Sequence, residues 1–222
     1  RQVHPNAKIA VFDKENSVGE HASGRNSGVL HAGFYYSPDS LKAALTRDGN
    51  KLLRDFCSEE NIQVKETGKV VVAQNPAEVA ALQELHRRGN ANGVVTELVT
   101  PERLAELEPL AKTSELALWS PHTAVANPLA VTQGLANKVA REGTTLKLGQ
   151  EVLRTTQNRI ITNLGNYSVG HIINCAGLYA DKVAKQFGYC DDYAMLPFKG
   201  LYWYGNWEPG KLQRHVYPVP DV

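Results

Sequence analysis

Short apolar runs rich in β-branched residues alternate along this chain with amphipathic helical stretches. The run "KIAVF" at 8–12 is typical of a buried parallel strand. Apolar residues then recur at helical spacing and predict a helix from about Ser40 to Glu59. The run "KVVVA" at 69–73 predicts the next strand. Because strands that alternate with helices are typical of α/β proteins, we predict an α/β fold.

Helix starts and stops are marked in the rest of the chain. Asn75, Pro76 and Glu78 have the spacing of a capping box and predict a helix through Leu85. Thr100-Pro101 predicts a shorter helix, and a further helix from about Leu129 stops at Gly143. A last helix is expected at 179–187, and further strands at 116–119, 146–148, 152–156, 159–163, 169–174 and 201–204.

These elements suggest two lobes. A parallel, apolar lobe is expected from residues 1–62 and 123–190. A lobe of short strands and capped helices is expected from residues 63–122 and 191–222.

Composition excludes several classes of function. With a net charge of +1 and scattered basic residues, we expect no nucleic-acid partner. Cys57, Cys175 and Cys190 form no CxxC pair, so we expect buried free thiols, no metal site and a reducing, cytoplasmic location. No apolar run approaches the roughly 20 residues that span a bilayer, and we see no signal peptide.

The segment "ASGRNSGVLHAGFYY" at 22–36 combines small, polar and aromatic residues. Its glycines, hydroxyls and amide would suit a flat, partly polar ring such as a flavin. His31 titrates near neutrality and could take a proton from an alcohol, although a lone histidine is more often a hydrogen-bonded structural residue. Arg25 and Lys42 could hold carboxylates, or they are simply solvated.

Three further places could carry chemistry. Asp13 ends a predicted parallel strand, where a carboxylate can bind ribose hydroxyls, although an exposed strand-end acid is the more common case. "CAGLYAD" at 175–181 has the strand–turn–helix pattern that approaches a phosphate or a ring, or it is an ordinary β–α turn. Lys199, in "LPFKGLYW", is a charge among aromatic residues.

Six segments occur together in the order found in one family. They are "VFDKE", "SGRNSGVLHAGFYYSPDSLKA", "WSPHTAVANP", "INCAGLYADKVAK", "LPFKGLYW" and "VYPVPD". The chain thereby resembles the L-2-hydroxyglutarate oxidases and dehydrogenases, within the D-amino-acid-oxidase-like flavoproteins. The resemblance covers nearly the whole chain, and the segments NSGVLHAG and NCAGLYAD are its most specific parts.

The resemblance implies FAD, bound by an incomplete Rossmann-like lobe, and a second α+β lobe for the substrate. It implies oxidation of L-2-hydroxyglutarate to 2-oxoglutarate, with hydride transfer to the flavin. His31 would be the base, and Tyr36 and Lys199 would contact the 2-hydroxy acid. The cofactor would be bound by residues spread over both ends of the chain: Asp13, Ser23, Arg25, Asn26, Ser27, Val152, Ala176 and Gly177.

The chain departs from the family pattern in several places. Arg25 stands where histidine is common, and Lys199 stands where arginine is usual. The family begins with a strand and a GxGxxG turn, and this sequence has no such turn. We therefore expect an internal fragment that by itself binds FAD weakly and is inactive, with an exposed sheet edge that favours self-association.

Two other functions fit the same residues. One is a related FAD-dependent oxidoreductase that acts on an amine, an amino acid or glycerol phosphate. The other is a non-catalytic fragment or binding module without FAD. The resemblance leaves oxygen and a quinone open as electron acceptors, and a quinone would imply a location at the inner membrane surface.

Overall fold

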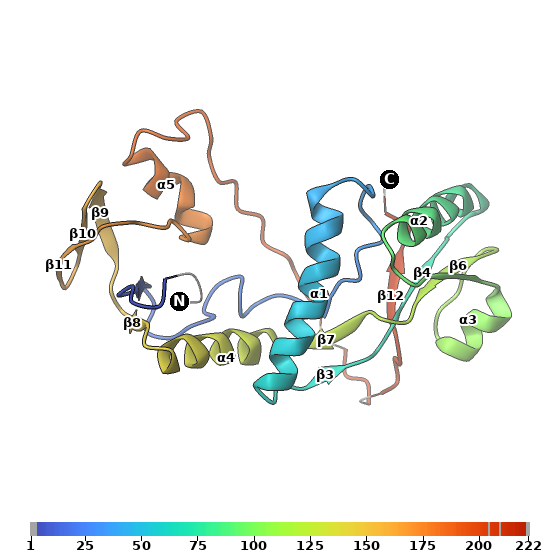
Figure 1. The fold of residues 1–222 in the computed structure, drawn as a ribbon. Helices are drawn as coiled ribbons and strands as arrows, with labels where there is room; N and C mark the ends of the chain where they lie inside the picture. Colours follow the sequence, from blue (N-terminus) through green and yellow to red (C-terminus); the bar gives the residue numbers. More distant parts are fainter. Residues whose placement is uncertain (1–3, 204, 209, 221–222) are drawn as a thin grey trace. The chain divides into compact units, whose positions relative to one another are not determined.

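The computed structural model describes residues 4–203, 205–208 and 210–220 of the chain (Figure 1). These residues form two compact units, each built from two separate stretches of sequence. The first unit comprises Arg1–Arg25 and Thr132–Gly205, and the second comprises Asn26–Val131 and Asn206–Val222.

The first unit contains a parallel strand pair and a small antiparallel sheet. Strand β1 (Ala10–Phe12) pairs in parallel with β8 (Thr145–Lys147), with Ala10 opposite Thr145. Strands β9 (Val152–Thr156), β10 (Arg159–Thr162) and β11 (Gly165–Ser168) form an antiparallel sheet in the order β11-β10-β9. The rings of Phe12 and Tyr167 meet edge to face at 4.9 Å and connect the two sheets.

The first unit also contains helical segments. Helix α4 (Pro128–Arg141) begins in the second unit and ends in the first, and Gly143 follows it with a φ of 85°. A 3-10 turn, η2 (Gly177–Tyr179), leads directly into α5 (Ala180–Lys185).

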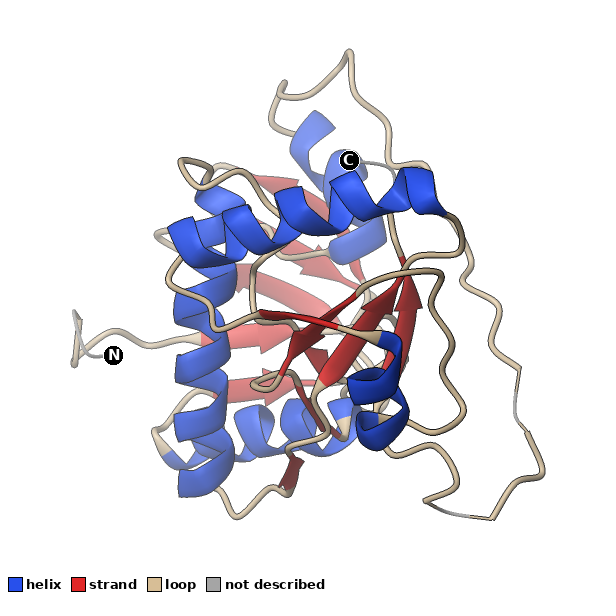
Figure 2. Cartoon of the chain, turned by 90° about the vertical axis from the view of Figure 1, so that its right-hand side faces the viewer, coloured by secondary structure: helices blue, strands red, loops and turns tan. Residues whose placement is uncertain are grey.

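The second unit is built on a four-stranded sheet in the order β12-β4-β6-β5. The bounds of these strands are β4 Lys69–Val72, β5 Glu97–Val99, β6 Ala117–Ser120 and β12 His215–Pro218. Strand β12 is parallel to β4, and the other pairs are antiparallel. A smaller sheet has the order β2 (Val29–Leu30), β7 (Ala124–Ala126) and β3 (Val64–Lys65) (strands red in Figure 2).

The helices of the second unit start at clear capping residues. The Ser40 hydroxyl accepts the Ala43 N–H at 3.2 Å and begins α1 (Leu41–Glu59). Thr100 caps α3 (Pro101–Leu107) in the same way. Between them, a 3-10 turn, η1 (Pro76–Glu78), precedes α2 (Val79–Ala91).

The core of the second unit lies on both faces of β4, whose four residues are all buried. On one face Val71 packs in a cluster with Leu82 and Leu85 of α2. On the other face Val70 and Val72 pack with Leu104 and Leu107 of α3. The alternation of side chains along a strand therefore places one helix on each face of this sheet.

The predicted α/β class is confirmed, and so are the helices that start at Ser40 and Thr100. The prediction of a capping box at Asn75 was wrong, because the Asn75 side chain accepts no capping hydrogen bond. Instead, the Glu78 carboxylate accepts hydrogen bonds from the Gln74 N–H and the Asn75 amide.

Two predicted strands were also wrong. Residues 169–174 and 201–203 are extended coil with no strand neighbour among the described residues, and Tyr204 lies outside the described residues. A β-rich composition forms a strand only where a neighbouring strand supplies its hydrogen bonds.

The cysteine prediction was right for one residue and wrong for two. All three described thiols are free, but only Cys57 is buried, whereas Cys175 and Cys190 are exposed. Cys175 lies in coil directly after residues 169–174, which were expected to be a strand.

The two units do not coincide with the expected lobes. Residues 26–62 and 123–131 are part of the second unit, and residues 191–205 are part of the first. The expected lobes were assigned by the ligand that each would bind, FAD or the substrate, and that assignment stays a prediction.

Candidate functional site

Strand β4 carries a lysine into the interior of the second unit. Lys69 has an exposed fraction of 0% and lies on the same face of β4 as Val71. In the sheet register His215 of β12 is opposite Lys69 on one side, and Ser120 of β6 is opposite it on the other. A fully buried lysine is rare unless an acidic or polar group pairs with its ammonium, so the groups around Lys69 Nζ are described next.

The nearest titratable neighbour of Lys69 is His31, which follows β2. Lys69 Nζ lies 3.3 Å from His31 Nδ1. The His31 backbone is held by helix α1, where the Asn50 amide donates to the carbonyls of Leu30 (3.2 Å) and His31 (3.0 Å). His31 is exposed as a residue, and the side that faces Lys69 is part-buried.

Helix α2 fixes the segment after His31. The buried Asn92 amide donates to the carbonyls of Gly33 and Tyr36, both at 3.0 Å. Arg88 donates to the Tyr35 carbonyl at 3.1 Å. The segment 31–36 is therefore attached to two helices, so its side chains are positioned by the rigid elements of the unit.

Aromatic rings surround the Lys69 ammonium. Its Nζ lies 4.3 Å from the ring centroid of Tyr217, 4.9 Å from that of Tyr35 and 5.6 Å from that of Phe34. These distances are in the cation–π range. Rings stabilise a cation less than a carboxylate would, so the site keeps an unneutralised positive group.

The pKa values follow from this environment. Burial lowers the pKa of Lys69 to about 8. Burial also lowers the pKa of His31 and of His215, and the charge of Lys69 lowers both further. Burial raises the pKa of Tyr35, so its phenol stays neutral. Among the described residues no ion pair joins any of these groups to a carboxylate.

Two polar atoms of this basic cluster (His31, Lys69 and His215, with Tyr35 and Tyr217) lack partners. His215 Nε2 and Tyr35 Oη are buried and have no hydrogen-bond partner in the part of the chain that the structure describes. Unpaired buried polar groups are costly, so such atoms commonly mark a place where a ligand or water is bound. Chemically, the cluster suits an anion and a group that exchanges protons near neutral pH.

Sequence reasoning identified His31 in this cluster but missed Lys69, His215 and Tyr217. The available signal for Lys69 was its position in "GKVVVA", a charge at the start of an otherwise apolar buried strand. His215 and Tyr217 had no comparable signal, because their place follows from the pairing of β12 with β4.

Asp13, one of the predicted cofactor residues of the first unit, lies at the carboxyl end of β1. Asp13 is exposed there, and its Oδ1 accepts the Glu15 N–H at 2.9 Å. Lys14 Nζ donates to the Tyr179 hydroxyl at 3.3 Å and lies 4.6 Å from that ring centroid. The strand end is thus linked to η2, which begins at the predicted Gly177 and follows Ala176.

Gly177 has the open geometry that a close ligand requires. Its φ is +55°, and a Cβ placed on it would meet no atom within 4 Å. Val152, another predicted cofactor residue, begins β9 of the same unit.

The polar residues before His31 are divided between the two units. Ser23 and Arg25 lie in the first unit, where Arg25 forms a 3.4 Å ion pair with Glu20. Asn26 and Ser27 lie in the second, where the Asn26 side chain accepts the Gly28 N–H at 2.9 Å. Each pair is exposed.

The two predicted substrate residues also fall in different units. Tyr36 lies in the second unit, and the Lys42 ammonium lies 5.8 Å from its ring centroid. Lys199 is exposed in an extended segment of the first unit.

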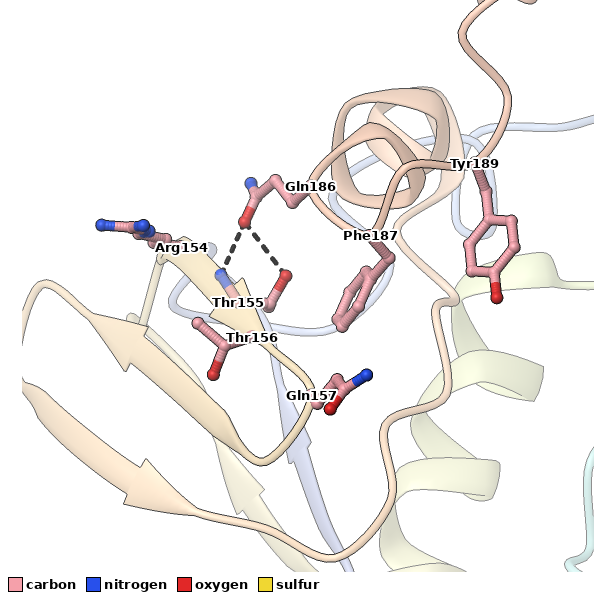
Figure 3. Close-up of a pocket in the computed structure, with 7 residues that line it drawn as sticks. All are labelled: Arg154, Thr155, Thr156, Gln157, Gln186, Phe187 and Tyr189. Carbon is pink, nitrogen blue, oxygen red and sulfur yellow. Dashed lines mark hydrogen bonds between the residues drawn. The ribbon is translucent and has the colours of Figure 1, made fainter.

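A pocket of about 560 Å³ lies in the first unit between β9 and the end of α5 (Figure 3). Gln186 reaches from the helix to the strand, where its Oε1 accepts the Thr155 N–H at 2.6 Å and hydroxyl at 3.0 Å. Phe187 and Tyr189 add aromatic lining. None of the predicted site residues lines this pocket.

The family model described as FAD dependent oxidoreductase matches residues 2–222, and the chain belongs to this family. The cofactor of the family is FAD.

Individual relatives agree with this assignment. The L-2-hydroxyglutarate dehydrogenase of Indibacter alkaliphilus is 40% identical over 228 residues, which cover 100% of this chain and 57% of that protein. The mitochondrial L-2-hydroxyglutarate dehydrogenase of Caenorhabditis elegans is 35% identical, over 98% of this chain and 52% of that protein. The chain therefore spans little more than half the length of these curated relatives.

A solved structure shows the same fold. Dithionite-reduced L-α-glycerophosphate oxidase from Mycoplasma pneumoniae, solved with FAD bound, matches with a TM-score of 0.76 and 22% identity. The match covers 96% of this chain and 59% of that one. Among the described residues, no helix has the length and apolar character that crossing a membrane requires.

The first unit fits part of an FAD molecule. An exposed carboxylate at the end of a parallel strand can accept ribose hydroxyls, and Asp13 has that position with Oδ1 already oriented by Glu15. The open space at Gly177 allows backbone N–H groups to approach the cofactor.

Proposed function

We propose that the intact protein, of which this chain would form little more than half if it has the length of its relatives, oxidises L-2-hydroxyglutarate to 2-oxoglutarate with FAD. The observation that carries the proposal is the basic cluster, in which His31, Lys69 and His215 share no carboxylate partner among the described residues. A hydroxyl that loses its proton requires a base, which this cluster would supply, and the dianionic substrate requires donor groups, which the predicted contacts Tyr36 and Lys199 would supply. The names of the two relatives described above support the same substrate.

Each predicted residue has a role in this proposal. Asp13, Ser23, Arg25, Asn26, Ser27, Val152, Ala176 and Gly177 would hold the cofactor, which when bound supplies an acceptor for the hydride of the substrate C2. His31 would take the hydroxyl proton. Its lowered pKa keeps the imidazole neutral at pH 7, as a base requires. Tyr36 and Lys199 would contact the substrate.

A substrate comparison tests the proposal. The intact protein, purified and loaded with FAD, is mixed anaerobically with L-2-hydroxyglutarate, its D-isomer, sarcosine or glycerol 3-phosphate, and flavin absorbance is followed. We expect bleaching with L-2-hydroxyglutarate alone, together with 2-oxoglutarate detected by mass spectrometry. Bleaching by sarcosine or glycerol 3-phosphate instead would assign the protein to a related oxidoreductase. If no substrate bleaches the flavin, or FAD does not bind, a non-catalytic role is the better conclusion.

A further inference from the structure

The two ring nitrogens of His31 have different surroundings. Nδ1 faces the Lys69 ammonium at 3.3 Å, whereas no hydrogen bond joins Nε2 to another residue in the ranges that the structure describes. A charged lysine is only a donor, so it requires an unprotonated Nδ1. The proton of a neutral His31 then lies on Nε2, and Nε2 cannot act as a base.

An uncharged lysine permits the opposite arrangement. Its amine nitrogen has a lone pair and accepts a hydrogen bond from a protonated Nδ1. The neutral imidazole then has its free lone pair on Nε2, the nitrogen without a protein partner.

We propose that Lys69 is a positioning residue for His31, and that His31 acts as a base only when the group beside its Nδ1 is uncharged. This inference rests on the proposed role of His31 as the base for a hydroxy acid. Lys69 is fully buried, so it acts through His31 and does not itself meet the substrate.

The environment of Lys69 supports an accessible uncharged state. Burial lowers the pKa of Lys69 to about 8, and no ion pair holds the ammonium among the described residues. The titratable groups that face the pair are His215 and Tyr217 from β12 and Tyr35 from the segment after β2. His215 has a lowered pKa and Tyr35 a raised one, so both are neutral where Lys69 titrates.

The proton step balances within the pair. The substrate O–H bond breaks as a bond from that proton to Nε2 forms. At the same time the Nδ1–H bond breaks, and the proton from Nδ1 binds Lys69 Nζ. The substrate loses one proton, the pair gains one positive charge, and the two electrons leave with the hydride.

The first test reads the tautomer directly and requires no activity. In protein labelled with 15N-histidine, NMR distinguishes a protonated ring nitrogen from an unprotonated one. We expect His31 to carry its proton on Nε2 at pH 7 and to transfer it to Nδ1 with a midpoint near pH 8. Lys69→Arg, which stays charged, should hold the proton on Nε2 throughout.

The second test compares kinetic pH profiles. In the wild-type protein we expect kcat/KM to rise with a midpoint near pH 8, which belongs to the pair as a whole. Lys69→Met should lower the midpoint below 6.5, because no ammonium then holds the His31 proton on Nε2 and burial still lowers the pKa of His31. Lys69→Arg should lose about 100-fold or more in kcat/KM at every pH, the usual size of general-base catalysis. Lys65→Met, at an exposed position on β3, is the matched control and should change neither value.

The outcomes separate this inference from the proposed function. If Lys69→Arg is as active as wild type, or Lys69→Met keeps the wild-type midpoint, the positioning role is overturned while the substrate assignment stands. If L-2-hydroxyglutarate is not oxidised but the tautomer change depends on Lys69, the proton pair stands and the proposed function fails. A purely electrostatic role in binding the substrate predicts the opposite order, with Lys69→Arg active and Lys69→Met inactive.

Discussion

The ammonium group of Lys69 is buried away from water, and three aromatic rings and two histidines are its neighbours, so folding exchanges its hydration for these contacts. A pKa of about 8 instead of 10.5 measures the cost of that exchange. A difference of this size corresponds to about 3 kcal/mol when the group is charged. A residue that weakens the fold at neutral pH is common in functional sites and uncommon elsewhere.

Replacing Lys69 with methionine should therefore stabilise the second unit. The unfolded chain binds more protons than the folded one between about pH 8 and 10.5, so wild-type stability rises with pH over that range. At pH 7 we expect Lys69→Met to raise the free energy of unfolding by about 1–3 kcal/mol, after the loss of cation–π attraction. The advantage should shrink as the pH approaches 10.5. Urea unfolding at pH 7 and 10 measures it, with Lys65→Met as the control.

The residue before Lys69 is equally constrained. Gly68 has a φ of +63°, and a Cβ on it would lie 1.9 Å from the Trp119 ring. Gly68→Ala combines backbone strain with a steric clash and should cost at least about 2 kcal/mol. Gly49→Ala in α1, where a Cβ meets nothing within 4 Å, should be neutral or stabilising. Equal thermal midpoints for the two variants would show that Trp119 moves aside freely.

At the scale of elements, local signals identified the helices and the strands with apolar runs. Ser40 and Thr100 cap their helices through bonds within three residues, which a sequence can show. Strand β12 could not be found in this way, because "HVYP" is short and pairs with β4 about 150 residues earlier. The same pairing brings His215 beside Lys69, so the part of the site that was missed depends on a long-range contact.

A buried carboxylate holds β12 in place. Glu108 has an exposed fraction of 0%, and its Oε2 accepts the N–H groups of Gln213 at 2.6 Å and Arg214 at 2.9 Å. Both donors immediately precede His215. The carboxylate thus fixes where the strand enters the sheet.

Removing this carboxylate should loosen β12. Glu108→Ala leaves the backbone donors of Leu110, Gln213 and Arg214 unpaired and should lower the free energy of unfolding by about 2–3 kcal/mol. Glu106→Ala, which removes an exposed ion pair with Arg103, should cost less than about 1 kcal/mol. Chemical denaturation compares the two variants. A similar small loss for both would contradict the role given to Glu108.

At the scale of the molecule, the two units differ in how much they bury. All three clusters of buried apolar side chains in the described residues belong to the second unit. In the first unit Ile9 and Val11, in or next to β1, are at least 36% exposed. Local stability follows buried apolar contact, so the units should not have equal stability.

Hydrogen exchange followed by mass spectrometry should show this difference. We expect amides of β4 and β6 to exchange slowest, because both strands are internal to the four-stranded sheet. Amides of β1 and β8 should exchange faster, since that sheet has only two strands. Equal protection in the two regions would show that the first unit is stabilised by something other than its own core.

The distribution of the cysteines makes the two units chemically distinguishable. Cys175 and Cys190 are open to a maleimide in the native protein, whereas Cys57, on α1, is buried against residues of the small sheet. Native labelling should therefore add two groups, both on peptides of the first unit. A third adduct should form only at the rate at which the second unit opens. The rate of Cys57 labelling in the wild-type protein therefore measures the opening of this unit without an engineered probe.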